Sequence, residues 1–227
     1  MRRALVLIHG AFQKGSVWKL IIPYMEACNY DVISPTLEGK TLTDHVNQVR
    51  DCVLSLNRPV TLLGHSYGSL VVTSTARLLP DSIEHLVLLD SPIPFSAAGE
   101  HQSLLDILGP DATEVFLSRT VDCRVQPFPP EAFGLDAKIH AEHVDELCEQ
   151  HLACFTEKGA SWCPADKYPF PIAYVQCAPN PFTQSQVEIA KRLGWQVLTL
   201  PEAGHCPMIT HAQALFILLR DSGLIES

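Results

Sequence analysis

A glycine–x–serine–x–glycine pattern at residues 64–68 (GHSYG) constrains the fold of this chain more than any other part of the sequence. It follows a short apolar run, 60–63, that is typical of a buried strand, and it opens the helical pattern at 67–79. Glycines on both sides of Ser66 permit a turn so tight that larger side chains would clash there. The pattern therefore predicts a strand–turn–helix unit that presents the Ser66 hydroxyl above the end of a strand.

Short apolar runs alternate with helical patterns along the chain. The runs are β-branched and show little polar alternation, as expected for strands that are covered on both faces. Alternating strands and helices favour a mostly parallel sheet with helices on both faces. We predict an α/β fold with a six-stranded sheet flanked by helices. The strands are expected at 4–8, 30–34, 60–63, 85–89, 172–176 and 196–200, and the helices at 16–28, 43–56, 67–79, 183–193 and 210–220.

The long interval between Asp90 and Ile172 breaks this alternation. It contains no convincing buried strand, but it has helical patterns at 102–108 and 141–155 and a proline-rich run at 127–130. A long insertion after the carboxyl end of a strand lies over the edge at which open α/β sheets bind ligands. We therefore expect a single domain, residues 1–227, with a helical cap inserted after the fourth strand at approximately residues 92–168.

Composition excludes several classes of function. The net charge is −9 and no basic cluster is present, which argues against nucleic-acid binding. The apolar run at 4–8 is too short for an export signal, and no stretch approaches the roughly 18 apolar residues of a membrane span. We expect a cytoplasmic protein without nucleic-acid or membrane partners. Nothing in the sequence indicates the oligomeric state.

The eight cysteines are scattered along the chain, and we expect them to be reduced thiols that pack as small apolar groups. One stretch, residues 140–154, brings histidines and cysteines close together in sequence. Its spacing matches none of the usual zinc patterns. We therefore expect no metal site and no cofactor.

A serine nucleophile needs a general base. His205 follows the last predicted strand and precedes the final helix, which is where the chain order serine–acid–histidine places the histidine. His9 and His65 lie within the first loop and the serine turn, and neither can readily reach over Ser66. We predict that His205 is the base.

The acid that orients the base is indicated mainly by elimination. The loop after the fifth predicted strand carries Asn180 roughly where an aspartate would stand, and an amide cannot supply the negative charge that stabilises an imidazolium. Asp90 ends the preceding strand, one strand nearer to the serine, and could reach the base. We predict Asp90 as the third member of the triad. The alternative is a Ser66–His205 dyad that Asn180 supports.

Two backbone N–H groups are expected to bind the oxyanion. One is that of Tyr67, directly after the serine. The other comes from the first loop, where Ala11 is the expected donor and Phe12 the alternative. Phe12, Phe95 and Trp162 are also expected to bind substrate as walls of an apolar pocket, although ordinary packing would explain each of them equally well.

Five segments carry a family resemblance: 7–11 (LIHGA), 64–68 (GHSYG), 88–92 (LLDSP), 125–134 (VQPFPPEAFG) and 203–205 (AGH). They resemble the α/β-hydrolase superfamily, and more narrowly its branch of plant methylesterases and hydroxynitrile lyases with their bacterial esterase relatives. The likeness runs over essentially the whole chain. It implies a core sheet that begins at the family's third strand. It also supports Asp90, because the bacterial relatives keep an aspartate in the Leu-Asp segment.

The predicted reaction is the hydrolysis of carboxylic esters through an acyl-enzyme intermediate. A cap rich in leucine, phenylalanine and proline favours small or medium apolar esters as substrates. A hydroxynitrile lyase would use the same triad and would need a cationic cap residue, for which Lys138, Lys158 and Lys167 are the candidates. A non-catalytic receptor for a small ligand on the same fold is the other alternative.

Overall fold

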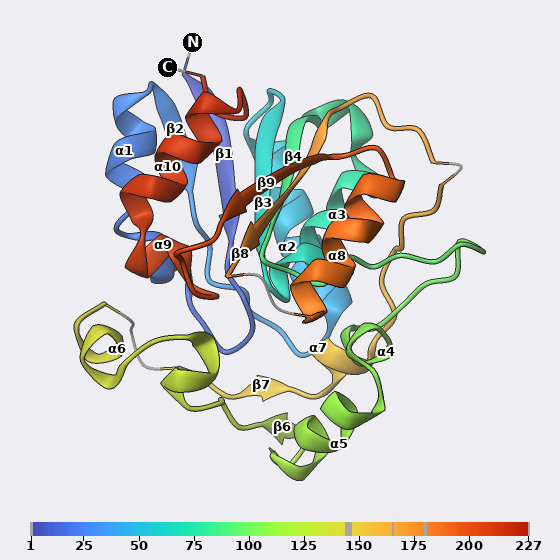
Figure 1. Cartoon of the computed structure of the whole chain (residues 1–227). Helices are drawn as coiled ribbons and strands as arrows, with labels where there is room; N and C mark the ends of the chain where they lie inside the picture. Colours follow the sequence, from blue (N-terminus) through green and yellow to red (C-terminus); the bar gives the residue numbers. More distant parts are fainter. Residues whose placement is uncertain (1, 144–146, 165, 179–180, 227) are drawn as a thin grey trace.

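The computed structural model describes residues 2–143, 147–164, 166–178 and 181–226. Within these residues, six strands form one parallel sheet in the order β2-β1-β3-β4-β8-β9 (Figure 1). The prediction of a six-stranded α/β sheet is confirmed. The strands are β1 (Arg3–Ile8), β2 (Tyr30–Ile33), β3 (Val60–His65), β4 (Ile83–Leu89), β8 (Ile172–Cys177) and β9 (Gln196–Leu200).

The inner strands are buried because helices cover both faces of the sheet. Every residue of β3 and β8 is buried, which explains why their sequences show no polar alternation. The register pairs Ile8 with Gly64 and Gly64 with Leu88. The loops that follow β1, β3 and β4 therefore open side by side at one edge of the sheet.

Two groups of helices pack on the sheet (Figure 1). The helices α1 (Ile22–Ala27) and α10 (Ala212–Asp221) lie on one face, and α2 (Leu42–Ser55), α3 (Gly68–Leu78) and α8 (Pro181–Arg192) lie on the other. The helix predicted at 16–28 is divided into the 3₁₀ helix Gly15–Trp18 and α1. The helix predicted at 210–220 corresponds to α10, which the short α9 (Pro207–Thr210) precedes. A 3₁₀ turn, Pro80–Ser82, leads from α3 into β4.

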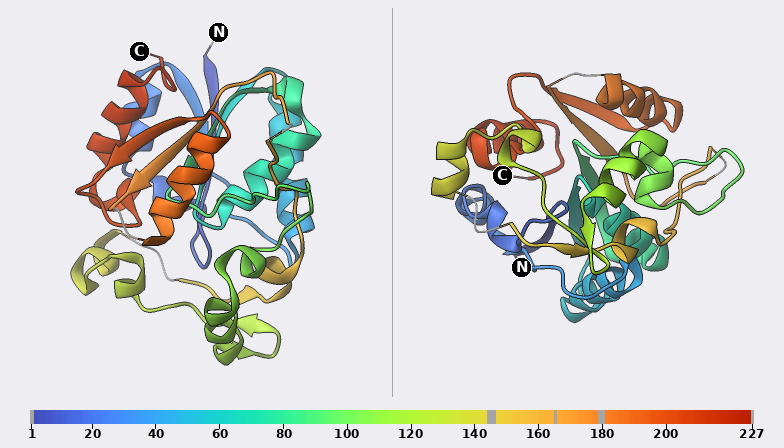
Figure 2. Two further views of the ribbon diagram at one scale, coloured as in Figure 1. Left: turned by 45° about the vertical axis from the view of Figure 1, so that its right-hand side comes forward. Right: turned by 90° about the horizontal axis from the view of Figure 1, so that it is seen from below.

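Residues 92–168 are here called the cap segment. In Figure 1 the described residues between 104 and 156 lie below the edge at which the parallel strands end, and Figure 2 shows them across that edge when the molecule is seen from below. They contain a small antiparallel sheet that the sequence did not predict, in the order β5-β6-β7. This sheet divides the helix expected at 141–155, and its two-residue strands are too short to show any periodicity. The elements are α4 (Leu104–Leu108), α5 (Pro110–Ser118), β5 (Thr120–Val121), β6 (Arg124–Val125), the 3₁₀ helix Pro130–Phe133, α6 (Ala137–His143), β7 (Gln150–His151) and α7 (Ala153–Thr156).

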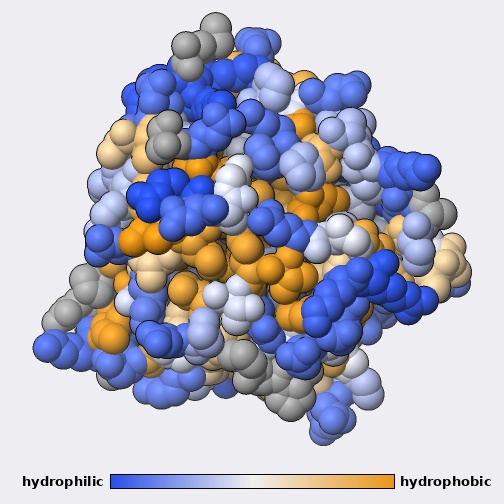
Figure 3. Space-filling model, turned by 45° about the horizontal axis from the view of Figure 1, so that its top comes forward, coloured by the Kyte–Doolittle hydropathy of each residue, from blue (hydrophilic) through white to orange (hydrophobic). Residues whose placement is uncertain are grey.

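On the face shown in Figure 3, apolar side chains gather toward the middle and hydrophilic ones surround them. Each of the eight cysteines falls within the described residues and is a free thiol. Among the helices of the described residues, none is long and apolar enough to cross a membrane.

Candidate active site

Ser66 lies at a turn of high backbone strain between β3 and α3. Its φ is +52°, which is unfavourable for a residue with a side chain. The turn closes because its neighbours are glycines. A Cβ on Gly64 would lie 2.6 Å from the carbonyl oxygen of Gly68, and a Cβ on Gly68 would lie 2.7 Å from that of His9. The backbone of the turn therefore packs directly against the first loop, which carries the second expected oxyanion donor.

Asp90 and His205 are in direct contact. The Nδ1–H of His205 donates to Asp90 Oδ2 at 2.8 Å, and Asp90 Oδ1 accepts the N–H of Cys177 at 2.8 Å. The Asp90 side chain is 5% exposed, so its negative charge is little screened by water. Because Nδ1 carries the proton, the other ring nitrogen, Nε2, is left as the basic one.

Both members of this pair share a cavity with the serine. Ser66, Asp90 and His205 line a hollow of about 270 Å³ between the sheet edge and the cap segment. The backbone N–H of Ser66 also donates to the carbonyl of Leu89 at 3.2 Å, which ties the turn to the strand that carries Asp90. Asn180, the support of the alternative dyad, lies outside the described residues.

His65, beside the nucleophile, contacts the loop of the base. Its Nε2–H donates to the carbonyl oxygen of His205 at 2.7 Å, and the two rings lie 4.6 Å apart. Burial holds the pKa of His65 well below its usual value, and the nearby His205 ring lowers it further. A neutral His65 supports the His205 loop without placing a second positive charge beside it.

The two expected oxyanion residues, Tyr67 and Ala11, both line the cavity. The Phe12 N–H, the alternative donor, already donates to Gln150 Oε1 at 3.1 Å. The Tyr67 hydroxyl is directed away into a buried hydrogen bond with His45 Nδ1 at 2.8 Å. Sequence reasoning did not identify Gln150, because neither its residue type nor its surroundings mark it before the chain is folded.

Of the three predicted pocket walls, only Phe12 lines the cavity. Trp162 is buried elsewhere, where its Nε1–H donates to Thr73 Oγ1 at 3.2 Å. Phe95 pairs with Trp162 in an isolated bridge, and the guanidinium of Arg192 lies 5.2 Å from its ring centre. These two aromatics join the cap segment to α3 and α8, so the pocket wall predicted from them differs from the one that the structure forms.

The cavity wall is instead built from apolar side chains of the cap segment. The rings of Phe12, Phe116 and Phe128 lie with their centres 5.2–6.3 Å apart. The residues 125–134, quoted above for their family likeness, supply part of this wall. The apolar residues that the cap segment contributes are Pro92, Leu104, Leu108, Phe116, Phe128, Ala132 and Phe133.

Within the described residues, the cavity has neither a permanently cationic side chain in its lining nor a cluster of potential metal ligands. Its lining includes no lysine or arginine, so Lys138, Lys158 and Lys167 are not among its walls. Across the described residues, no group of three or more histidine, cysteine or acidic side chains is arranged to hold a metal ion.

Comparisons with known proteins identify the family and the fold. The carbendazim hydrolyzing esterase of Nocardioides sp. is 28% identical over 229 residues, covering 90% of this chain and 93% of the relative. Among solved structures, an extracellular alpha/beta-hydrolase from Paenibacillus has a TM-score of 0.78 at 18% identity, covering 96% of this chain and 97% of its own. Tomato methylketone synthase I has a TM-score of 0.77 at 15% identity, covering 100% of both chains. The model of the alpha/beta hydrolase family matches residues 5–217, and the chain therefore belongs to that family.

Proposed function

We propose that this protein is a serine ester hydrolase whose catalytic triad is Ser66, His205 and Asp90. The observation that carries the proposal is the 2.8 Å contact between Asp90 and His205 at the wall of a cavity that Ser66 also lines. A strained nucleophile, a base with a defined tautomer and a buried carboxylate are the three parts that acyl transfer requires.

Each step of the reaction has a residue of this chain to perform it. His205 Nε2 removes the proton of Ser66 as the hydroxyl oxygen attacks the ester carbonyl. The backbone N–H groups of Tyr67 and Ala11 bind the oxyanion. His205 then protonates the leaving alcohol, and a water molecule repeats the sequence on the acyl-enzyme to release the acid. Asp90 stabilises the imidazolium that forms in both halves.

The cavity supports small or medium uncharged substrates. Its volume of about 270 Å³ limits the size of the group that fits beside the serine, and its aromatic wall offers no counter-charge to an anionic ester. The Nocardioides relative is named for the hydrolysis of carbendazim, and the tomato structure is a complex with 2-tridecanone. Both names are compatible with an apolar pocket. A hydroxynitrile-lyase reaction, which would need a cation here, has no observation in its favour.

The test is hydrolysis of 4-nitrophenyl esters with acyl chains of two to eight carbons by the wild type and Ser66→Ala. We expect the variant to lose about 10³-fold or more in kcat, because the nucleophile is absent. Ser55→Ala, an exposed position on α2, is the matched control and should retain full activity. Absence of wild-type turnover on all of these esters would contradict the proposal.

A further inference from the structure

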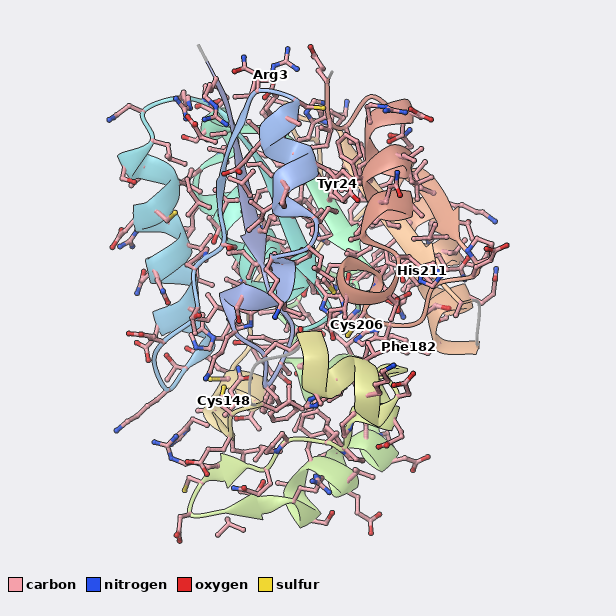
Figure 4. The ribbon with its side chains drawn as sticks, turned by 90° about the vertical axis from the view of Figure 1, so that its left-hand side faces the viewer. Arg3, Tyr24, Cys148, Phe182, Cys206 and His211 are labelled. Atoms are coloured by element: carbon pink, nitrogen blue, oxygen red, sulfur yellow. The ribbon has the colours of Figure 1, made fainter. Side chains whose placement is uncertain are left out.

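The backbone of Phe12 is held on both sides by the cap segment. Its N–H donates to Gln150 Oε1 at 3.1 Å, and its carbonyl oxygen accepts the N–H of Cys148 at 2.9 Å. Figure 4 shows Cys148 at the junction of the cap segment and the α/β core. One residue of the first loop is thus bound by a stretch more than a hundred positions away in the chain.

Phe12 needs this support because its backbone is strained. Its φ of +65° lies in the left-handed region, which a phenylalanine adopts only when surrounding contacts enforce it. Its ring is 2% exposed and packs against Phe116, Phe128 and Phe155. The ring alone does not fix the orientation of the peptide groups on either side of it. The two hydrogen bonds to the cap segment do.

Gln150 is itself held in place by the small antiparallel sheet of the cap segment. It belongs to β7, where it pairs with Val125 of β6, and the following Leu152 donates its N–H to the carbonyl of Cys123 at 2.8 Å. The Gln150 and Tyr67 side chains both interact with the Cys154 thiol and lower its pKa, against the larger effect of burial, which raises it. Gln150 therefore lies between the first loop, which it binds through Phe12, and a thiol that also neighbours Tyr67.

The other end of the first loop is tied to the loop of the base. Gln13 is buried, its Oε1 accepts the N–H of Gly10 at 3.2 Å, and its Nε2 donates to Cys206 Sγ at 3.4 Å. Ala11 thus lies between Gly10, which Gln13 links to the His205 loop, and Phe12, which Gln150 links to the cap segment. The direction of its N–H depends on both.

We propose that Gln150 is a positioning residue for the oxyanion site: it fixes the Ala11–Phe12 peptide and thereby orients the adjoining Gly10–Ala11 peptide, whose N–H is the expected oxyanion donor. The inference rests on the proposed function, since the oxyanion forms only if an ester reacts at Ser66. Gln150 makes no contact with the reacting atoms. It acts through the backbone of Phe12, and its loss lowers the rate of the chemical step more than the affinity for substrate.

The experiment compares Gln150→Met with wild type and with Gln126→Met. Methionine has a similar length but no hydrogen-bond acceptor comparable to an amide oxygen. Gln126 follows β6, and its side-chain amide donates to the exposed Glu149 rather than to the first loop, so the same substitution there is the matched control. Gln150→Ala, which places no new apolar chain at the site, is the second variant in case the first does not fold.

Two measurements separate positioning from general damage. The first is kcat and KM on the best 4-nitrophenyl ester. The second is inhibition by an alkyl trifluoromethyl ketone, which adds to the serine and forms an oxyanion, and by the matching methyl ketone, which stays in its ground state. Stabilisation of the oxyanion affects only the first inhibitor.

We expect kcat to fall about 10- to 100-fold in both Gln150 variants, less than the full loss of an oxyanion donor, with KM changed by less than about threefold. The Ki of the trifluoromethyl ketone should rise by the same factor as kcat falls, and that of the methyl ketone should not change. Three results would overturn the inference and leave the proposed function intact. In the Gln150 variants, the Ki values of both ketones could rise equally, or kcat could stay at the wild-type value. The third such result is a fall of kcat in Gln126→Met as large as that in Gln150→Met. Absence of wild-type turnover would overturn both.

Discussion

Asp90 Oδ2 lies 2.8 Å from His205 Nδ1, although 115 positions separate the two residues in the chain. The contact crosses one strand of the sheet: Asp90 follows β4, His205 follows β9, and β8 lies between these two strands. The N–H of Cys177, the last residue of β8, binds the second carboxylate oxygen. The middle strand therefore fixes the orientation of the carboxylate that faces the imidazole.

This geometry predicts the effect of Asp90→Asn. In this variant the amide oxygen would accept the Cys177 N–H, so the NH₂ group would face the ring and donate to Nδ1. The ring proton would then lie on Nε2, the nitrogen that must act as the base, and the amide carries no charge to stabilise the imidazolium. We expect kcat to fall about 10³- to 10⁴-fold with little change in KM. Steady-state kinetics would measure this, with the exposed Asp51→Asn as control. Retention of most of the activity would favour the dyad supported by Asn180.

Trp162→Phe distinguishes a structural role from substrate contact. The indole N–H bonds to Thr73 in a fully buried setting, and phenylalanine leaves that hydroxyl without its donor. We expect the free energy of unfolding in urea to fall by about 1–3 kcal/mol. kcat/KM should stay within about twofold of wild type, because the ring lies outside the cavity. A selective rise in KM would instead identify Trp162 as part of the substrate site.

Phe116→Leu tests which residues set the size of the pocket. Phe116 extends from α5 into the cavity and packs edge-on against Phe128 and Phe155. A smaller side chain lengthens the hollow, so the preferred acyl chain should become longer by about one or two carbons, at about 0.8 kcal/mol per buried methylene. A series of 4-nitrophenyl esters would measure the shift. Phe170→Leu, buried outside the cavity, should leave the optimum unchanged.

Two buried histidines make stability depend on pH. Burial lowers the pKa of His9 and of His45 to about 4, whereas both titrate near 6.5 in an unfolded chain. Between about pH 4 and pH 6.5, the two histidines bind protons in the unfolded chain but not in the folded chain. Stability is therefore complete above pH 6.5 and falls as the pH is lowered toward 4, by about 3 kcal/mol for each residue.

Urea unfolding at pH 8, 6, 5 and 4.5 would measure this loss. His45→Gln keeps a hydrogen-bonding group for the Tyr67 hydroxyl but cannot titrate, so its stability should decline less steeply below pH 6.5. At pH 8 the ring is neutral in both states, and pH should contribute nothing to the difference between the two proteins. Parallel curves for variant and wild type across the whole range would contradict the assignment to His45.

The elements with a strong local pattern could be predicted from the sequence. The buried strands were visible as apolar runs, and the serine turn as two glycines around Ser66. The helix expected at 43–56 begins one residue earlier, at Leu42, because Thr41 is its N-cap and forms a capping box with Asp44. Asp90 was reached by elimination, since a lone aspartate after a strand carries no signal of its own.

The rest depends on contacts that form only after folding. The strands β5, β6 and β7 have two residues each, and their pairing partners lie up to 27 positions apart in the chain. An aromatic residue in the cap segment is equally suited to a pocket wall or to the core. Phe116 and Trp162 differ in this respect only because α5 faces the serine, whereas the segment around residue 162 packs on α3.

The double role of Phe12 determines how such an enzyme can be redesigned. Its ring lines the cavity, and in the proposed mechanism its backbone supports the oxyanion site, so we expect a replacement at this position to alter selectivity and rate together. Phe116 and Phe128 line the same cavity, but their backbones have no part in the proposed oxyanion site. Libraries that vary Phe116 and Phe128 and leave position 12 unaltered should yield new selectivities at undiminished turnover, whereas libraries that include position 12 should return mostly slow variants.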